Sequence, residues 1–152
     1  DLAWYFAAPQ KFLGDQSSFY HGSLEFNLGH FMFDTTGGGP STQYADVIIE
    51  AKSKKVVLGA KHVFQSKQAG VNYVVPFSAD PFTSVCLSGN FSARCRGDGE
   101  PCHREEECCS RRCVGTPARW YNLKSGKPAT NMELLKALSA ISALKIRGGH
   151  YP

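Results

Sequence analysis

Five cysteines lie within the stretch CRGDGEPCHREEECCSRRC, which runs from Cys95 to Cys113, and a sixth, Cys86, lies just upstream. Thiols in such a cluster could act as nucleophiles, bind a metal ion or form disulfides. The gaps between successive cysteines are eight, six, five, zero and three residues, unlike the Cys-x(2–4)-Cys pairs of structural zinc sites. An even number in one short cluster indicates three disulfides in a protein outside the cytosol. The six candidates are Cys86, Cys95, Cys102, Cys108, Cys109 and Cys113.

Two short motifs lie in the same segment. Asn90-Phe91-Ser92 is an N-glycosylation sequon, which fits a secreted protein and predicts a glycan on Asn90. Arg96-Gly97-Asp98 is a tripeptide of adhesive ligands, and a loop closed between Cys95 and Cys102 would present it. A tight turn at the glycine and ordinary surface charges explain the tripeptide equally well, and we favour this explanation over adhesion.

The sequence contains no recognisable catalytic motif. Its five histidines, at positions 21, 30, 62, 103 and 150, occur in unrelated contexts. None forms part of a His-x-x-Glu-His pattern, and the chain has no nucleophile elbow. We therefore predict that the protein is not an enzyme and needs no cofactor.

Acidic side chains raise the question of a structural calcium ion. Asp15, Asp46 and Glu50 could supply oxygen ligands if the fold brought them together. No Asp-x-Asp spacing supports such a site, so surface or turn roles are the favoured interpretation.

The formal charge of +4 is unevenly distributed. From Arg94 to Arg112, five arginines balance five acids, so the excess comes from elsewhere, notably Lys52, Lys54, Lys55, Lys61 and Lys67. This basic face could attract acidic polysaccharide, although lysine also protects strand edges from aggregation, which is the favoured explanation. The modest charge and the secreted character argue against nucleic acid as a partner.

Aromatic residues offer a further candidate for binding, since they could stack on sugars. Most aromatics of a β-rich fold belong to its core, and we expect Trp4 and Trp120 to be buried. The candidates for a sugar-stacking platform are Trp4, Tyr5, Tyr20, Tyr44, Tyr73, Trp120 and Tyr121.

The elements that must position these residues are mostly strands. LEFNLGHFMF alternates apolar and polar residues, ADVIIEA and KKVVLGA are rich in β-branched residues, and VNYVVPF ends at an edge or bulge with Pro76. One helix is expected at about 130–141, because Thr130 and Glu133 form a capping box ahead of an apolar stripe. ALKIRGG then returns as a strand.

Together these elements predict an all-β fold, an antiparallel β-sandwich or jelly roll with one short helix and a disulfide-rich insertion. No apolar run is long enough to cross a membrane. Asp1 opens onto an aromatic, strand-like segment without a signal peptide, as expected of a mature secreted chain or a domain of a longer one.

Three stretches resemble the laminin IV type A (laminin B) domain. They are YFAAPQKFLGDQSSFYHGSLEFNL, YADVIIEAKSKKVVLG and ELLKALSAISALKIRGGHY, and they occur in the order expected of that family. The resemblance implies an antiparallel β-sandwich that serves as a building block of the extracellular matrix and has no enzymatic activity. It supplies no ligand residues that map onto this chain.

Residues 86–113 depart from the laminin pattern and look inserted between two strands. The expected organisation is therefore a laminin-IV-like sandwich of residues 1–85 and 119–152 around an insertion of residues 86–113. The family's last strand, after ALKIRGG, is also missing, so the chain continues beyond Pro152 or a neighbouring molecule completes that edge.

The insertion resembles cystine-knot miniproteins (knottins) in its cysteine spacing and its Cys-Cys-Ser run. That family has a cysteine after the fifth, which this chain lacks, and Cys86 would take its place. Knottin-like connectivity implies the pairs Cys95–Cys109, Cys102–Cys113 and Cys86–Cys108, one of fifteen possible arrangements.

The main functional hypothesis is a non-catalytic, secreted structural or assembly domain that makes protein–protein contacts. Its expected partners are other matrix or filament subunits, including copies of itself, without insertion into a membrane. The alternative is a carbohydrate-binding module that uses exposed aromatics or the basic face.

Overall fold

The computed structural model describes residues 4–28, 44–64, 71–82 and 117–148. The six cysteines, the Asn90 sequon and Arg96-Gly97-Asp98 lie outside the described residues, as does Lys67. The predicted insertion, its disulfides and its glycan therefore stay predictions.

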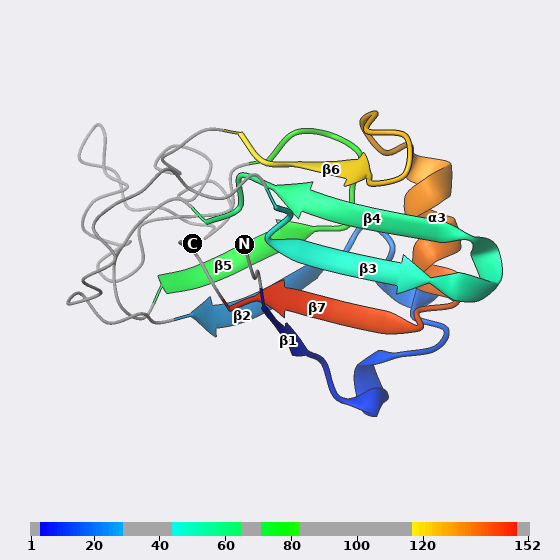
Figure 1. The fold of residues 1–152 in the computed structure, drawn as a ribbon, viewed down its shortest axis with the longest axis horizontal. Coiled ribbons are helices and arrows are strands. Elements are labelled where there is room, and N and C mark those ends of the chain that lie inside the picture. Colours follow the sequence, from blue (N-terminus) through cyan, green and yellow to red (C-terminus); the bar gives the residue numbers. More distant parts are fainter. Residues whose placement is uncertain (1–3, 29–43, 65–70, 83–116, 149–152) are drawn as a thin grey trace, which may run out of the picture.

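Five of the strands form one antiparallel sheet (Figure 1). Central strand β3 pairs with β4 on one side and with β7 on the other, and β6 and β1 form the two edges. In sheet order the strands are β1 (Tyr5–Ala7), β7 (Ala143–Arg147), β3 (Val47–Ala51), β4 (Val56–Lys61) and β6 (Arg119–Asn122). The predicted strands ADVIIEA, KKVVLGA and ALKIRGG are thus confirmed.

Two further strands, β2 (Ser23–Leu28) and β5 (Val71–Pro76), pair antiparallel as a second sheet. Leu24, Phe26 and Leu28 pack against the core, whereas Glu25 and Asn27 are exposed, as the alternating sequence predicts. Figure 1 shows this pair behind the larger sheet. The predicted antiparallel β-sandwich is confirmed.

The core lies between the two sheets. Val47, Ile49 and Leu58 of the larger sheet share one buried cluster with Tyr73 and Val75 of the smaller one. Trp120 is fully buried, as predicted, and its indole N–H donates to the Pro76 carbonyl at 2.8 Å. Because Trp120 belongs to β6 and Pro76 to β5, this bond joins the two sheets.

One α-helix, α3 (Asn131–Ser139), covers one end of the sandwich (Figure 1). The Thr130 hydroxyl accepts from the Glu133 amide, and the Glu133 carboxylate accepts from the Thr130 amide, so the predicted capping box is confirmed. Leu134 and Leu138 are fully buried against the core.

The helix ends at Ser139, two residues before the predicted boundary of about residue 141. Ala140 has φ of −154° and ψ of 55°, outside the helical region. Ile141 forms an antiparallel bridge with Gly14, its amide donating to the Gly14 carbonyl at 2.9 Å. This bridge commits Ile141 to an extended backbone and ends the helix at Ser139.

Trp4 corrects a second prediction, since 53% of this residue is exposed rather than buried. It lies before the edge strand β1, where it packs against Phe6 with ring centroids 4.8 Å apart. A tryptophan at a sheet edge has only one covered side, which the strand-like sequence around it does not reveal.

Phe82 and Ala118 form an isolated bridge on either side of the cysteine-rich segment. The Phe82 amide donates to the Ala118 carbonyl at 2.9 Å, and the Ala118 amide donates back at 2.6 Å. Phe82 and Ala118, which flank the cysteine-rich segment in the sequence, are therefore neighbours in space.

Candidate functional site: an apolar pocket beside an open strand edge

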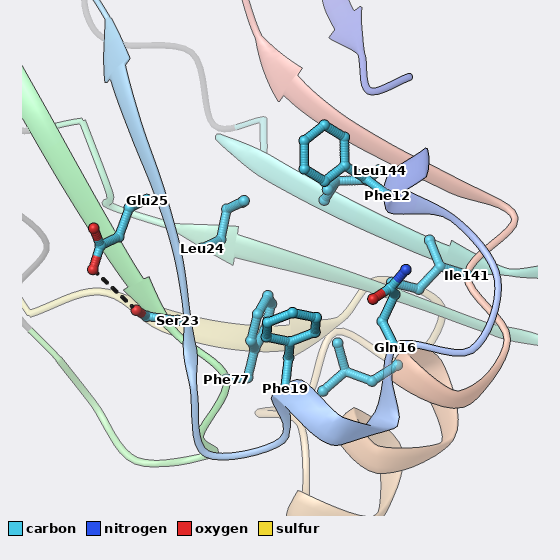
Figure 2. A pocket seen from close by; sticks show the side chains of 10 residues that line it. Phe12, Gln16, Phe19, Ser23, Leu24, Glu25, Phe77, Ile141 and Leu144 are labelled. Carbon is cyan, nitrogen blue, oxygen red and sulfur yellow. Dashed lines mark hydrogen bonds between the residues drawn. The ribbon is translucent and has the colours of Figure 1, made fainter. Parts of the chain in front are cut away.

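A half-open pocket of about 210 Å³ lies between β2, α3 and the N-terminal segment (Figure 2). Its lining is mostly apolar and comes from five parts of the chain. The lining residues are Phe12, Gln16, Phe19, Ser23, Leu24, Glu25, Phe77, Leu138, Ile141 and Leu144.

Two phenylalanines form the rim of the pocket because two short 3-10 helices hold them there. Phe12 ends η1 (Gln10–Phe12), which follows Pro9, and Phe19 ends η2 (Ser17–Phe19). Phe12 is 45% exposed and Phe19 is 53% exposed, which is unusual for such large apolar side chains.

Asp15 stabilises the start of η2. Its carboxylate accepts from the Ser17 hydroxyl at 2.6 Å and from the Ser17 amide at 3.0 Å. These hydrogen bonds lower the pKa of Asp15 below its ordinary value. Asp15 therefore has a local role in the turn that carries Phe19.

The floor of the pocket is tied to the helix and to the residues that connect it to β7. The Gln16 amide donates to the Leu138 carbonyl at 2.7 Å, and Gly14 bridges Ile141. Gly14 has φ of 85°, a left-handed conformation that favours glycine. These bonds fix Leu138 and Ile141 opposite the rim.

The polar side chains that line the pocket are few, and those of Gln16 and Ser23 already form hydrogen bonds within the protein. The Gln16 side-chain amide donates to the Leu13 carbonyl at 3.1 Å, and the Ser23 hydroxyl lies 3.4 Å from a Glu25 carboxylate oxygen. Glu25 is the single ionisable residue among those that line the pocket. The pocket is therefore suited to an apolar side chain rather than to acid–base catalysis.

One edge of β2 borders the pocket. β5 occupies the other edge, and no strand among the described residues pairs with β2 on the pocket side. In Figure 2, most of the labelled lining side chains lie on the side of β2 away from β5, whereas those of Ser23 and Glu25 lie on the other side. We call the side of β2 away from β5 its outer edge.

The register of β2 and β5 shows which backbone groups lie on the outer edge. Ser23 is opposite Pro76, which has no amide hydrogen, and the Phe77 amide donates to the Gly22 carbonyl at 2.9 Å. Hydrogen-bonded and non-hydrogen-bonded pairs alternate in an antiparallel ladder. The N–H and C=O groups of Ser23, Glu25 and Asn27 therefore point outwards, away from β5.

A buried ion pair lies apart from the pocket, between Asp46, which precedes β3, and Arg147, which ends β7. Asp46 is 3% exposed and Arg147 is 2% exposed, and the Arg147 guanidinium donates to an Asp46 oxygen. The other Asp46 oxygen accepts from the amides of Val63 and Phe64 at 2.8 and 3.1 Å. Asp46 thus fixes the segment that follows β4.

The three acids considered as calcium ligands are not brought together. Asp15 binds Ser17, Asp46 pairs with Arg147, and Glu50 pairs with Lys145 at 2.7 Å. Within residues 4–28, 44–64, 71–82 and 117–148, no group of three or more possible metal ligands is found. These residues therefore stabilise turns and strands.

The aromatic candidates are also dispersed. Tyr73 and Trp120 are buried, and burial raises the pKa of the Tyr73 hydroxyl to about 12, with the Asp46 carboxylate contributing. Tyr5 donates to the Ala45 carbonyl at 2.9 Å, and Tyr44 is 48% exposed. The most exposed aromatics include three phenylalanines that the sequence interpretation did not consider: Phe6, Phe12 and Phe19.

The basic face is only partly continuous. Lys52, Lys54 and Lys55 lie in the turn between β3 and β4, whereas Lys61 ends β4, with its ammonium 5.5 Å from the centre of the Tyr121 ring. Lysines from a distant part of the sequence join the first group instead. Lys124 donates to the Lys55 carbonyl at 2.9 Å, and Lys127 lies in the same turn as Lys124.

The described residues thus form a sandwich of two antiparallel sheets with one helix at its end and one open strand edge. A family model described as Laminin B (Domain IV) matches residues 5–106, more than half of the chain, so the chain belongs to this family. The matched range includes residues 86–106 of the cysteine-rich segment. No curated protein matches the chain.

Among solved structures, the chain is similar to the L4b domain of human laminin alpha-2. The two are 12% identical with a TM-score of 0.47, and the match covers 96% of this chain. The chain spans 60% of the length of that structure. A likeness this distant carries no functional conclusion.

Family membership gives the broad functional class. The family consists of structural, non-enzymatic domains, and laminin domains take part in protein interactions in the extracellular matrix. Among the described residues, no helix has the length and apolarity needed to cross a bilayer.

Proposed function

We propose that this domain is a secreted assembly module that binds an extended segment of a neighbouring matrix protein along the outer edge of β2. The observation that carries the proposal is the position of the apolar pocket directly beside that edge. An added strand would obtain affinity from backbone hydrogen bonds and specificity from alternate side chains. The outward groups of Ser23, Glu25 and Asn27 supply the hydrogen bonds.

The side chains along β2 indicate the chemistry of the partner. Residues directly opposite one another in a sheet place their side chains on the same face. A partner residue opposite Glu25 would therefore lie on the exposed face, where a lysine or arginine is favoured. Its two neighbours would point inwards, one of them into the pocket beside Leu24. The partner is an extended segment with an apolar–basic–apolar alternation.

A second copy of this chain fits the edge less well. Symmetric pairing of two β2 strands about Glu25 would place two carboxylates opposite each other, which is destabilising. We therefore favour a different matrix protein over self-association.

The cysteine-rich segment has a separate role in this proposal. We infer that residues 86–113 form a disulfide-bonded, knottin-like unit that projects from the sandwich as a rigid contact. The bridge between Phe82 and Ala118 supports this proposal, because it brings together two residues that flank the segment. Non-reducing peptide mapping tests it, and a pairing other than Cys95–Cys109, Cys102–Cys113 and Cys86–Cys108 would reject the knottin arrangement.

Selection of random octapeptides displayed on phage, with the folded chain as bait, tests strand addition. We expect enrichment of apolar–basic–apolar sequences that bind wild type. The test variant is Glu25→Pro, which removes an outward amide hydrogen but leaves the bonds to β5 intact. The control is Glu25→Gln, which keeps the backbone donor.

Strand addition predicts that Glu25→Pro loses at least tenfold in affinity, whereas Glu25→Gln loses only the preference for a basic residue. Circular dichroism and the thermal midpoint establish that both variants are folded. Selected peptides that bind Glu25→Pro as tightly as wild type would rule out the outer edge as the binding site.

A further inference from the structure

Two turns at the α3 end of the sandwich bring together lysines that are about 70 residues apart in sequence (Figure 1). The turn from β3 to β4 contains η3 (Lys52–Lys54) and Lys55. The turn after β6 contains the second group. We call the five side chains the lysine cluster: Lys52, Lys54, Lys55, Lys124 and Lys127, all of which are exposed.

Backbone pairing fixes the two turns next to each other. β4 and β6 are neighbours, and the Leu123 amide donates to the Val57 carbonyl at 2.9 Å. The Lys124 ammonium then donates to the Lys55 carbonyl at 2.9 Å, which ties one turn to the other. Lys55 has φ of 56°, so this turn has a tight left-handed end.

The carboxylates nearest in sequence are already engaged. Glu50 pairs with Lys145 at 2.7 Å, and Glu133 accepts from Asn122 and from the Thr130 amide. Neither ion pair between described side chains, Lys145–Glu50 or Arg147–Asp46, includes a member of the lysine cluster. The cluster therefore concentrates positive charge without a carboxylate in ion-pair contact among the described residues.

We propose that the lysine cluster binds a sulfated polysaccharide of the extracellular matrix. Five ammonium groups on two exposed turns match a flexible chain with repeated negative charges better than a small anion, which needs an enclosed site. The site is independent of the outer edge of β2, and the two ligands differ in chemistry. Binding of this kind weakens as salt screens the charges.

Affinity for immobilised heparin, measured across a salt series with the complete disulfide-bonded chain, tests the proposal. The test variant is the double substitution Lys54→Gln and Lys127→Gln. The matched control is Lys11→Gln with Lys61→Gln, which removes the same charge outside the cluster. Hyaluronan, which carries carboxylates without sulfates, and vesicles containing phosphatidylserine are the comparison ligands.

We expect wild type to bind heparin at 150 mM salt and the cluster variant to bind roughly thirtyfold more weakly, since each of the two lysines it lacks contributes on the order of 1 kcal/mol near an anionic surface. The control should remain within about twofold of wild type. Equal losses of heparin affinity in the two variants would show that binding depends only on the net charge of the protein and would overturn the proposal. No wild-type binding to heparin, or tighter binding to the vesicles or to hyaluronan, would also overturn it.

Discussion

Asp46 and Arg147, which lie 101 residues apart, form the most deeply buried charge pair among the described residues. The Asp46 carboxylate also accepts two backbone amides, from Val63 and Phe64, so both of its oxygens are satisfied. Removal of one member of such a pair leaves an uncompensated buried charge, whereas an exposed pair contributes little.

Asp46→Asn should therefore lower the free energy of unfolding by about 3–5 kcal/mol. Glu50→Gln is the comparison, because the Lys145–Glu50 pair has side chains that are 35% and 22% exposed, and its loss should cost under about 1 kcal/mol. Urea denaturation measures both. Similar losses in the two variants would contradict a special role for the buried pair.

Glu133 makes stability depend on pH. The hydrogen bond from the Asn122 side chain, with smaller contributions from Thr130 and Lys136, lowers the pKa of Glu133 below its ordinary value of 4.5. A carboxyl with a depressed folded-state pKa stabilises the protein above its unfolded pKa, and this contribution is lost as pH falls through the folded value.

We therefore expect the stability difference between wild type and Glu133→Gln to be constant above about pH 5.5 and to shrink below pH 4.5. Thermal unfolding from pH 3 to pH 7 measures the difference. A stability difference between the two proteins that is independent of pH would show that Glu133 acts through hydrogen-bond geometry alone.

At the scale of secondary-structure elements, close packing of β4 depends on Gly59. A Cβ at this position would lie 2.6 Å from the Ala45 Cβ and 2.8 Å from a methyl of Leu123. The Ala45 methyl cannot rotate away, so β4 or the chain around Ala45 must shift.

Gly59→Ala should consequently destabilise the fold by about 1–3 kcal/mol, as overpacked cores do. Chemical denaturation provides the measurement. Unchanged or increased stability would mean that the segment around Ala45 adjusts without cost.

Secondary-structure elements could be predicted from the sequence where a short local sequence pattern determines them. The alternation in β2 and the Thr130–Glu133 capping box are local, and the structure confirms both. The end of α3 was not predictable, because the bridge from Ile141 to Gly14 ends it and depends on a segment far away in sequence.

The candidate site was largely hidden in the sequence for the same reason. The pocket gathers residues from Phe12 to Leu144, and its rim depends on two 3-10 turns without a strong sequence pattern. The alternating pattern predicted that Leu24 faces the core. It could not predict that no described strand pairs with the outer edge of β2. Sheet order is a property of the whole fold.

At the scale of the whole molecule, the sandwich offers contacts at two places. The outer edge of β2 would bind a neighbouring strand, and the lysine cluster at the α3 end would bind sulfated polysaccharide. One domain of the laminin B (Domain IV) family could thereby join a protein partner to the polysaccharide of the matrix.

Residue-resolved amide hydrogen exchange tests the central claim, strand addition at β2, most directly. In the free chain, the amides of Ser23, Glu25 and Asn27 should exchange rapidly, whereas those of Leu24 and Phe26 should be protected by β5. A selected apolar–basic–apolar peptide should slow exchange at Ser23, Glu25 and Asn27. Protection that appears elsewhere, with these three amides unchanged, would contradict strand addition at the outer edge of β2.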